Sequence, residues 1–329
     1  MIGRGAAIFG CDGLTLGTEE RAFFRDADPF GFILFARNVD APEQLRRLTA
    51  ELREAVGRDA PILVDQEGGR VQRLRAPHWA EHLPALDMMT RARDPHRAMK
   101  LRFALIAAEL RAVGIDANCA PVADVATDAT HPFLRNRCYG FDPSTVTELA
   151  RVAADAHLAQ GVLPVIKHMP GHGRATADSH RDLPTVTADR ATLEGDFAPF
   201  RALNHLPMAM TAHIVFSALD DRPATCSPVM IDLIRQDIGF DGLLMTDDIE
   251  MEALSGSVAE RTRLSLAAGC DVVLHCNGAM PARRAVAEAA GEMGPDARRR
   301  AEAALALRTP ARAIDVAALS AELSDLLDA

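Results

Sequence analysis

Eight short apolar runs, each followed by a segment with helical spacing, constrain the fold of this chain more than any other feature. The runs are apolar on both faces, as strands of a parallel sheet covered by helices must be. Eight strand-helix units without a break favour a single closed (β/α)8 barrel of the TIM type, although the pattern also allows an open doubly wound α/β sheet. The runs cover residues 6–10, 30–36, 60–66, 115–125, 162–168, 207–216, 242–248 and 270–277.

The segments between these runs predict amphipathic helices. In residues 41–56, for example, Leu45, Leu48 and Leu52 recur at helical spacing. Several helical segments end at a glycine just before the next strand, where glycine accepts the left-handed conformation of a helix end. The predicted helices are residues 18–28, 41–56, 95–113, 144–160, 189–204, 228–237 and 257–268.

The length of 329 residues suits one barrel with insertions, and the chain shows no linker, internal repeat or low-complexity segment. About 50 residues follow the last strand, and they are rich in Ala, Arg and Glu at helical spacing. We therefore expect one catalytic domain over residues 1–329, with a helical C-terminal tail from about residue 280.

Charge and composition exclude several classes of partner. The net charge of −10 argues against non-specific nucleic-acid binding, so an anionic ligand would need a local cationic cluster. No run of 18 apolar residues exists, the N-terminal apolar run is too short for a secretory signal, and the six cysteines form no Cys-x-x-Cys pair. These features predict a cytoplasmic protein with reduced core thiols and with no nucleic-acid or membrane partner. We also expect a monomer.

Polar side chains stand where the predicted strands end, and the active site of a barrel enzyme lies at that face. At the seventh strand, only one of Asp247 and Asp248 should face the barrel mouth, because successive strand residues point to opposite faces. Periodicity does not choose between them. The polar strand-end residues are Asp65, Glu67, Arg70, Arg73, Asp124, Arg135, Arg137, Lys167, His168, His213, Asp247, Asp248, His275 and Asn277.

The loop KHMPGHGRATADSH (167–180) after the fifth strand is the most specific feature. It carries Asp178 two residues before His180, and a carboxylate beside a histidine can hold one tautomer and stabilise the imidazolium. We therefore expect this pair to act as a general acid/base unit. The loop begins with glycines and contains small side chains, which predicts that it is mobile in the empty enzyme and closes over a bound ligand.

Taken in order, six segments make the chain resemble glycoside hydrolase family 3, and in particular its single-domain bacterial β-N-acetylhexosaminidases of the NagZ type. The resemblance covers most of residues 5–280. It departs from the family pattern at Met169, where an aromatic residue is common, and at Cys138 and Thr246, where serine is usual. The segments are VDQEGGRVQRL (64–74), APVADV (120–125), the stretch around Arg137, KHMPGHG…DSH (167–180), MTAH (210–213) and MTDDIEM (245–251).

This resemblance implies retaining hydrolysis that removes a terminal N-acetylglucosamine from peptidoglycan fragments (muropeptides) in cell-wall recycling. Asp247 would be the nucleophile and His180 the acid/base, assisted by Asp178. No metal and no organic cofactor are implied. Arg135 lies close enough in sequence to compete with Arg137 for its role. The residues implied to hold the sugar hydroxyls and the acetamido group are Asp65, Arg73, Arg137, Lys167 and His168.

A muropeptide carries negative charge, and a cationic cluster in this region would suit an anionic aglycone. The residues that we expect to form that cluster are Lys167, His168, His172 and Arg174.

Three other functions can be built on the same scaffold. A metal-dependent barrel hydrolase could use His168, His172, His180, His213 and Asp247, but the first strand lacks the His-x-His pair that such barrels generally need. A non-catalytic sugar-binding barrel would need no nucleophile, so Asp247 and the Asp178–His180 pair argue against it. A phosphorylase or a β-glucosidase stays open, because a histidine beside the anomeric carbon repels phosphate less than a carboxylate would.

Overall fold

The structure is a computed structural model that describes residues 2–177 and 183–328. Parallel strands form a closed barrel in the order β1-β10-β9-β7-β5-β4-β3-β2, which confirms the predicted (β/α)8 fold and excludes the open sheet. The barrel closes where Ile8 pairs with Leu274. The barrel strands are β1 (Gly5–Gly10), β2 (Pro29–Leu34), β3 (Ile62–Val64), β4 (Ala117–Asn118), β5 (Leu163–Met169), β7 (Met208–Thr211), β9 (Leu243–Asp248) and β10 (Val272–His275).

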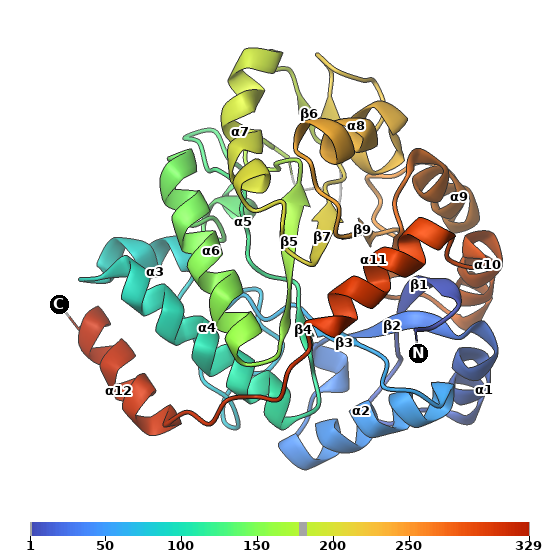
Figure 1. The fold of residues 1–329 in the computed structure, drawn as a ribbon, viewed down its shortest axis with the longest axis horizontal. Helices are drawn as coiled ribbons and strands as arrows, with labels where there is room; N and C mark the ends of the chain where they lie inside the picture. The colour runs from blue at the N-terminus through green and yellow to red at the C-terminus, as the bar shows by residue number, and fades with distance from the viewer. Residues whose placement is uncertain (1, 178–182, 329) are drawn as a thin grey trace.

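Helices surround the barrel, as Figure 1 shows, and the seven predicted helical segments are all present. Beyond them, α12 near the C-terminus packs on α4, where Leu323 meets Leu101 and Leu105. The helices are α1 (Thr18–Ala27), α2 (Pro42–Val56), α3 (Ala85–Arg91), α4 (Pro95–Ala112), α5 (Pro132–Arg135), α6 (Pro143–Ala159), α7 (Arg190–Ala202), α8 (Pro228–Asp232), α9 (Val258–Ala268), α10 (Met280–Ala290), α11 (Pro295–Ala306) and α12 (Val316–Leu327), with the short 3-10 helices η1 (Ala36–Asn38) and η2 (Ala224–Cys226) and the π-helix η3 (Leu233–Asp237), which continues α8.

The barrel strands are buried on both faces, as their apolar runs predict. Every residue of β2 and β5 is buried, including Lys167 and His168 near the end of β5. Burying a large apolar side chain contributes about 1.5–3 kcal/mol. The barrel interior is therefore rigid enough to hold polar groups in place at its open end.

Most predicted strand runs are longer than the observed strands, and two of them differ most in extent. The run 115–125 forms a continuous ladder only over Ala117–Asn118. Beyond it, Pro121 has no N–H to donate, and the run pairs with β5 again only at the single Val122–Lys167 bridge. The end of the run 207–216 leaves the barrel as β8 (Val215–Phe216), which pairs with β6 (Thr185–Val186) in a separate small sheet. The short helices α3 and α5 lie in loops for which the sequence predicted no helix.

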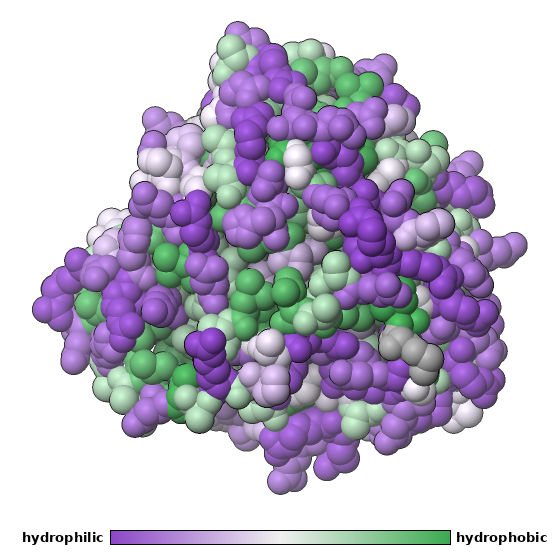
Figure 2. Space-filling model, viewed as in Figure 1, coloured by the Kyte–Doolittle hydropathy of each residue, from purple (hydrophilic) through white to green (hydrophobic). Residues whose placement is uncertain are grey.

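The surface in Figure 2 is mostly hydrophilic, with smaller apolar areas between the polar side chains. Among the residues that the structure describes, no helix is both long and apolar enough to span a membrane. The six thiols are unpaired, and all but Cys226 are buried.

Candidate active site

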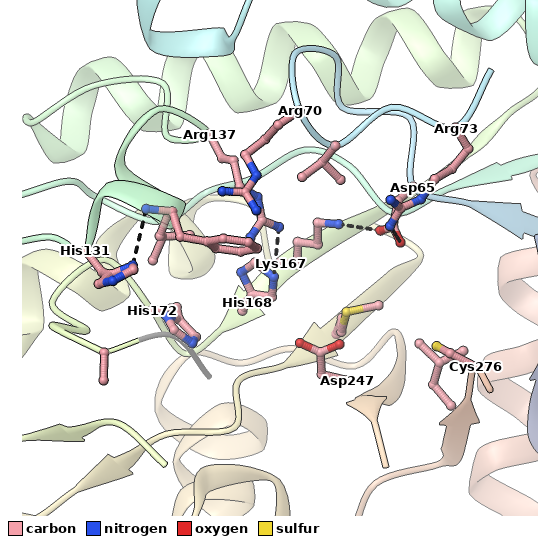
Figure 3. A pocket seen from close by; sticks show the side chains of 16 residues that line it. Asp65, Arg70, Arg73, His131, Arg137, Lys167, His168, His172, Asp247 and Cys276 are labelled. Atoms are coloured by element: carbon pink, nitrogen blue, oxygen red, sulfur yellow. Dashed lines mark hydrogen bonds and ion pairs between the residues drawn. The ribbon is translucent and has the colours of Figure 1, made fainter. Parts of the chain in front are cut away.

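A cavity of about 370 Å³ opens at the C-terminal ends of the barrel strands (Figure 3). Asp65 follows β3, Lys167 and His168 stand on β5, and Asp247 stands on β9, and all four line the cavity. The polar strand ends therefore converge as the barrel fold predicts. Arg73, Arg137, His172, Met210, Leu274 and Cys276 also line the cavity.

A network of paired charges at the cavity, which we call the inner wall, consists of Asp65, Glu67, Lys167 and Arg137. All of these except Glu67 line the cavity. Lys167 is 2% exposed, and its Nζ donates to Asp65 Oδ1 at 2.8 Å and lies 2.6 Å from Glu67 Oε1. Arg137 binds Glu67 through two hydrogen bonds of 2.9 and 2.8 Å. Arg73 donates to the second oxygen of Asp65 at 3.1 Å.

These contacts keep the carboxylates of the inner wall ionised. Burial alone would raise the pKa of Glu67, but the charges of Arg137 and Lys167 outweigh it and lower that pKa to about 2. Burial likewise opposes ionisation of Asp65, and Lys167 with Arg73 holds its pKa well below the usual range. The cations of the inner wall are therefore balanced by carboxylates, and their side chains are fixed in position.

His168 is oriented by a buried carboxylate behind it. Its Nδ1 lies 2.7 Å from Asp124 Oδ2, and the His172 backbone N–H donates to the other oxygen of Asp124 at 2.7 Å. Burial opposes ionisation of Asp124, yet His168 lowers its pKa to about 2. An ionised carboxylate only accepts, so Nδ1 carries the proton and Nε2 is left facing Arg137 at 3.4 Å.

Of the two adjacent aspartates on β9, Asp247 lines the cavity. The Asp248 side chain instead turns to the backbone, where its Oδ1 accepts from the N–H groups of Cys276 at 3.1 Å and Glu250 at 3.2 Å. Asp247 is therefore the aspartate that faces the barrel mouth, which the periodicity of the sequence did not determine.

The Asp247 carboxylate is ionised, although it pairs with no cation of residues 2–177 and 183–328 in a salt bridge. Burial raises its pKa, but His213, His168, the Asp248 backbone N–H and Lys167 together lower it below the ordinary value. The pKa of Asp248, in contrast, is raised by burial and by the charge of Asp247. An ionised carboxylate that faces a cavity can serve as a nucleophile.

His213 positions the end of β9. Its Nε2 donates to the Asp248 carbonyl oxygen at 2.9 Å, and its Nδ1 lies 2.7 Å from Thr225 Oγ1. Burial lowers the pKa of this imidazole, which favours its neutral form. His213 is therefore a positioning residue that holds the backbone beside Asp247.

The first part of the loop after β5 is packed rather than loose. Ala175 is buried and its carbonyl accepts from the His131 N–H at 2.9 Å. At Gly173, a Cβ would lie only 1.8 Å from the Val125 carbonyl oxygen, so this glycine permits close packing. The small side chains of this part of the loop therefore anchor it, contrary to what their size suggested, while closure of the loop over a ligand stays a prediction. Asp178 and His180 lie outside the described residues.

The sequence predicted a cationic cluster of Lys167, His168, His172 and Arg174, and this prediction is wrong because members of the cluster are paired or neutral. Lys167 is balanced by the two carboxylates of the inner wall, and Arg174 pairs with Asp196 at 2.5 Å. Burial, followed by the charge of His168, lowers the pKa of His172 to about 4, so this ring is neutral at neutral pH. These side chains orient groups within the site and supply little net positive charge to a ligand.

The structure also separates the two candidate arginines. Arg137 lines the cavity, whereas Arg135 is exposed and donates to the Asp128 carbonyl oxygen at 3.1 Å. The sequence did not single out Phe133 and His131, which line the cavity from the loop after β4. Neither is a charged strand-end residue. Phe133 lies in the stretch around Arg137, but nothing in the sequence showed that its ring would face the cavity.

Within the described ranges, no three His, Cys, Asp or Glu side chains are grouped as metal ligands. The metal-dependent alternative therefore gains no support from this part of the chain.

Comparison with known proteins gives the family. Residues 16–300 match the model of the glycosyl hydrolase family 3 N terminal domain. The chain is 38% identical over 282 residues to a protein named beta-hexosaminidase from Alkalilimnicola ehrlichii, covering 83% of this chain and 81% of that protein. A beta-hexosaminidase from Bordetella avium is 37% identical over 288 residues, with coverages of 84% and 82%.

Solved structures agree with this relationship. NagZ from Neisseria gonorrhoeae superimposes with a TM-score of 0.82 at 31% identity, covering 99% of this chain and 98% of that one. A family 3 beta-N-acetylglucosaminidase from Paenibacillus sp. gives a TM-score of 0.87 at 28% identity, covering 98% of this chain and 67% of that one. The chain therefore belongs to glycoside hydrolase family 3 and is related to its β-N-acetylhexosaminidases of the NagZ type.

Proposed function

We propose that this β-N-acetylhexosaminidase removes terminal β-linked N-acetylglucosamine with retention of configuration, through a covalent glycosyl-enzyme on Asp247. The observation that carries the proposal is the Asp247 carboxylate, which is held ionised at the cavity. His180 is the acid/base and Asp178 assists it. Both assignments rest on the loop motif.

The reaction proceeds in two balanced steps. An oxygen of Asp247 attacks the anomeric carbon while the bond to the aglycone oxygen breaks, and His180 gives that oxygen its proton. Water then attacks the anomeric carbon of the glycosyl-enzyme, His180 takes a proton from the water, and the bond to Asp247 breaks. The sugar leaves with its original configuration and the enzyme regains its starting protonation.

The inner wall and the neighbouring Arg73 supply the groups that hold the sugar. Asp65 offers acceptor oxygens, and Lys167, Arg73 and Arg137 offer donors whose directions are fixed by their ion pairs. His168 lines the cavity, and its Nε2 faces Arg137. Such fixed groups orient hydroxyl and acetamido groups without reorganising when the substrate binds.

The substrate class that we propose is a muropeptide whose terminal sugar is N-acetylglucosamine, and the setting is peptidoglycan recycling in the cytoplasm. The relationship to proteins of the NagZ type supports the substrate. The six unpaired thiols fit a reducing compartment. The proposed chemistry needs no metal and no organic cofactor.

Turnover of synthetic substrates tests the reaction. We expect the enzyme to cleave 4-nitrophenyl N-acetyl-β-glucosaminide far faster than the matching glucoside, and to release the free β-anomer first in an NMR time course. The rate should not depend on phosphate. A preference for the glucoside, release of a sugar phosphate, or first formation of the α-anomer would each contradict the proposal.

A further inference from the structure

Arg70 is exposed at the cavity and forms no ion pair with any carboxylate of the described residues. The other cations that line the cavity differ from it, because Lys167, Arg73 and Arg137 each contact Asp65 or Glu67. A guanidinium that lacks a carboxylate partner keeps its paired donors available for a carboxylate that arrives with a ligand.

A tight turn places Arg70 at this position. The Glu67 and Gly68 N–H groups both donate to the Val71 carbonyl oxygen, at 2.9 and 3.1 Å. Gly69 has a φ of +62°, and a Cβ there would lie 2.8 Å from Pro84 Cα. Arg75 donates to the carbonyl oxygens of Gly69 and Arg70, which fixes the backbone. One turn thus directs Glu67 into the inner wall and presents Arg70 to solvent.

The Arg70 side chain is held on an aromatic ring. Its guanidinium carbon lies 3.5 Å from the centroid of the Phe133 ring, and the guanidinium carbon of Arg137 lies 5.7 Å from the same centroid. Stacking limits the freedom of the long side chain, so less conformational entropy is lost when a ligand binds. We call Arg70, His131 and Phe133 the rim of the cavity.

The rim lies apart from the sugar-holding carboxylate. Figure 3 shows Arg70, Arg137 and His131 on one side of Lys167, with Asp65, Arg73 and Cys276 on the other. An exo-acting hydrolase holds the terminal sugar at the closed part of its cavity and the leaving group toward solvent. Since Arg70 is exposed whereas Lys167 is buried, the rim is the part that a leaving group can reach.

We propose that Arg70, held on Phe133, binds a carboxylate of the aglycone and makes the enzyme selective for anionic leaving groups. This inference rests on the proposed function and adds a specificity-determining residue to it. In a muropeptide the carboxylate has two possible sources, the lactyl group of the muramic sugar or the attached peptide. Both present the same planar anion to a guanidinium.

Substitution of Arg70 tests the inference with three substrates of different aglycone charge. Arg70→Gln keeps polar groups and removes the charge. Diacetylchitobiose has a neutral aglycone, the peptide-free N-acetylglucosaminyl-anhydromuramic disaccharide carries the lactyl carboxylate, and its tripeptide derivative carries peptide carboxylates. Arg135→Gln is the matched control, because Arg135 is an exposed arginine in the same region that does not line the cavity.

We expect Arg70→Gln to lower kcat/KM about tenfold for at least one anionic disaccharide, mainly through KM, because a lost charge-assisted contact costs this much. The kcat/KM of Arg70→Gln for diacetylchitobiose should change less than about twofold, and Arg135→Gln should have wild-type kcat/KM for all three substrates. The anionic substrate whose kcat/KM falls more identifies the source of the carboxylate. Raising the salt concentration should lower the wild-type preference for the anionic substrate and leave the variant unaffected.

The outcomes separate this inference from the proposed function. If the wild type cleaves N-acetylglucosaminides but Arg70→Gln affects neutral and anionic substrates equally, or neither, then the inference fails and the proposed function stands. If the wild type cleaves no N-acetylglucosaminide, the proposed function fails first. Arg70→Lys should recover part of the preference, because it restores the charge without the planar pair of donors.

Discussion

The inner wall and the rim of the cavity both carry arginine, yet they place it in opposite electrostatic settings. In the inner wall, Arg137 forms a two-bond ion pair with Glu67 and is nearly buried. On the rim, Arg70 is exposed and lies on an aromatic ring. The difference shows that a charged residue near a site can serve either to fix geometry or to bind a ligand. The side chains that contact the charged residue determine which of these two roles it has.

The largest loss of activity should come from substitution of Asp247, which belongs to neither the inner wall nor the rim. Asp247→Asn removes the nucleophile, and a retaining mechanism has no route around it, so kcat should fall by at least about 10⁴-fold. Asp248→Asn should cost less than about tenfold, since an asparagine oxygen can still accept a backbone hydrogen bond. Steady-state kinetics on 4-nitrophenyl N-acetyl-β-glucosaminide measure both, and circular dichroism checks the fold. The reverse ranking would identify Asp248 as the nucleophile.

The structural role of the inner wall predicts a large loss of stability for Glu67→Gln. This change leaves buried Arg137 and Lys167 with too little negative charge, and breaking a buried ion pair costs about 3–5 kcal/mol. The matched control is Glu81→Gln, which removes an exposed pair with Arg75 and should cost at most about 1 kcal/mol. Urea denaturation gives both free energies of unfolding. Equal losses would mean that the inner wall is not a stabilising network.

Acidification should weaken the folded state in two stages. His172 has a folded pKa of about 4 against an ordinary 6.5, so the unfolded chain binds more protons between these values and stability falls as the pH drops through this range. The folded pKa of Glu67, about 2 against an ordinary 4.5, extends the loss to lower pH. Denaturation at a series of pH values tests this. A free energy of unfolding that stays constant from pH 7 to 4 would contradict it.

The smallest effect should come from Phe133→Leu on the rim. Losing the ring beneath Arg70 removes a contact worth about 0.5–1 kcal/mol at an exposed site, so KM for an anionic disaccharide should rise only two- to fivefold. KM for diacetylchitobiose serves as the internal control and should stay nearly constant. An increase of the same size for both substrates would show that Phe133 acts on the terminal sugar instead.

The sequence predicted the barrel because its signal is repeated eight times and each strand must be covered on both faces. It predicted Asp65, Lys167, His168 and Asp247 near one another because barrel strand ends converge. The extent of β4 was not predictable from the apolar run, since hydrophobicity does not report where the ladder ends.

Pairing of charges was the part of the site that sequence reasoning missed. From the sequence alone we predicted a positive cluster that included Lys167, His172 and Arg174. The side chains that pair with the two cations lie on separate loops and helices, so the sequence did not reveal the pairing. Asp196, for example, lies on α7. His131 and Phe133 gave no signal at all, because a loop residue gains its role only from where the loop packs.

Asp247 is the residue that we propose forms the glycosyl-enzyme, and trapping of this covalent species identifies the nucleophile directly. A 5-fluoro N-acetylglucosaminyl fluoride slows both steps by destabilising the oxocarbenium-like transition state, while its good leaving group lets the intermediate accumulate. We predict an intact-mass increase of one fluorosugar, located by peptide mapping on Asp247. An adduct on Asp248 or another side chain, or complete turnover with no adduct and inverted product, would show that Asp247 is not the nucleophile.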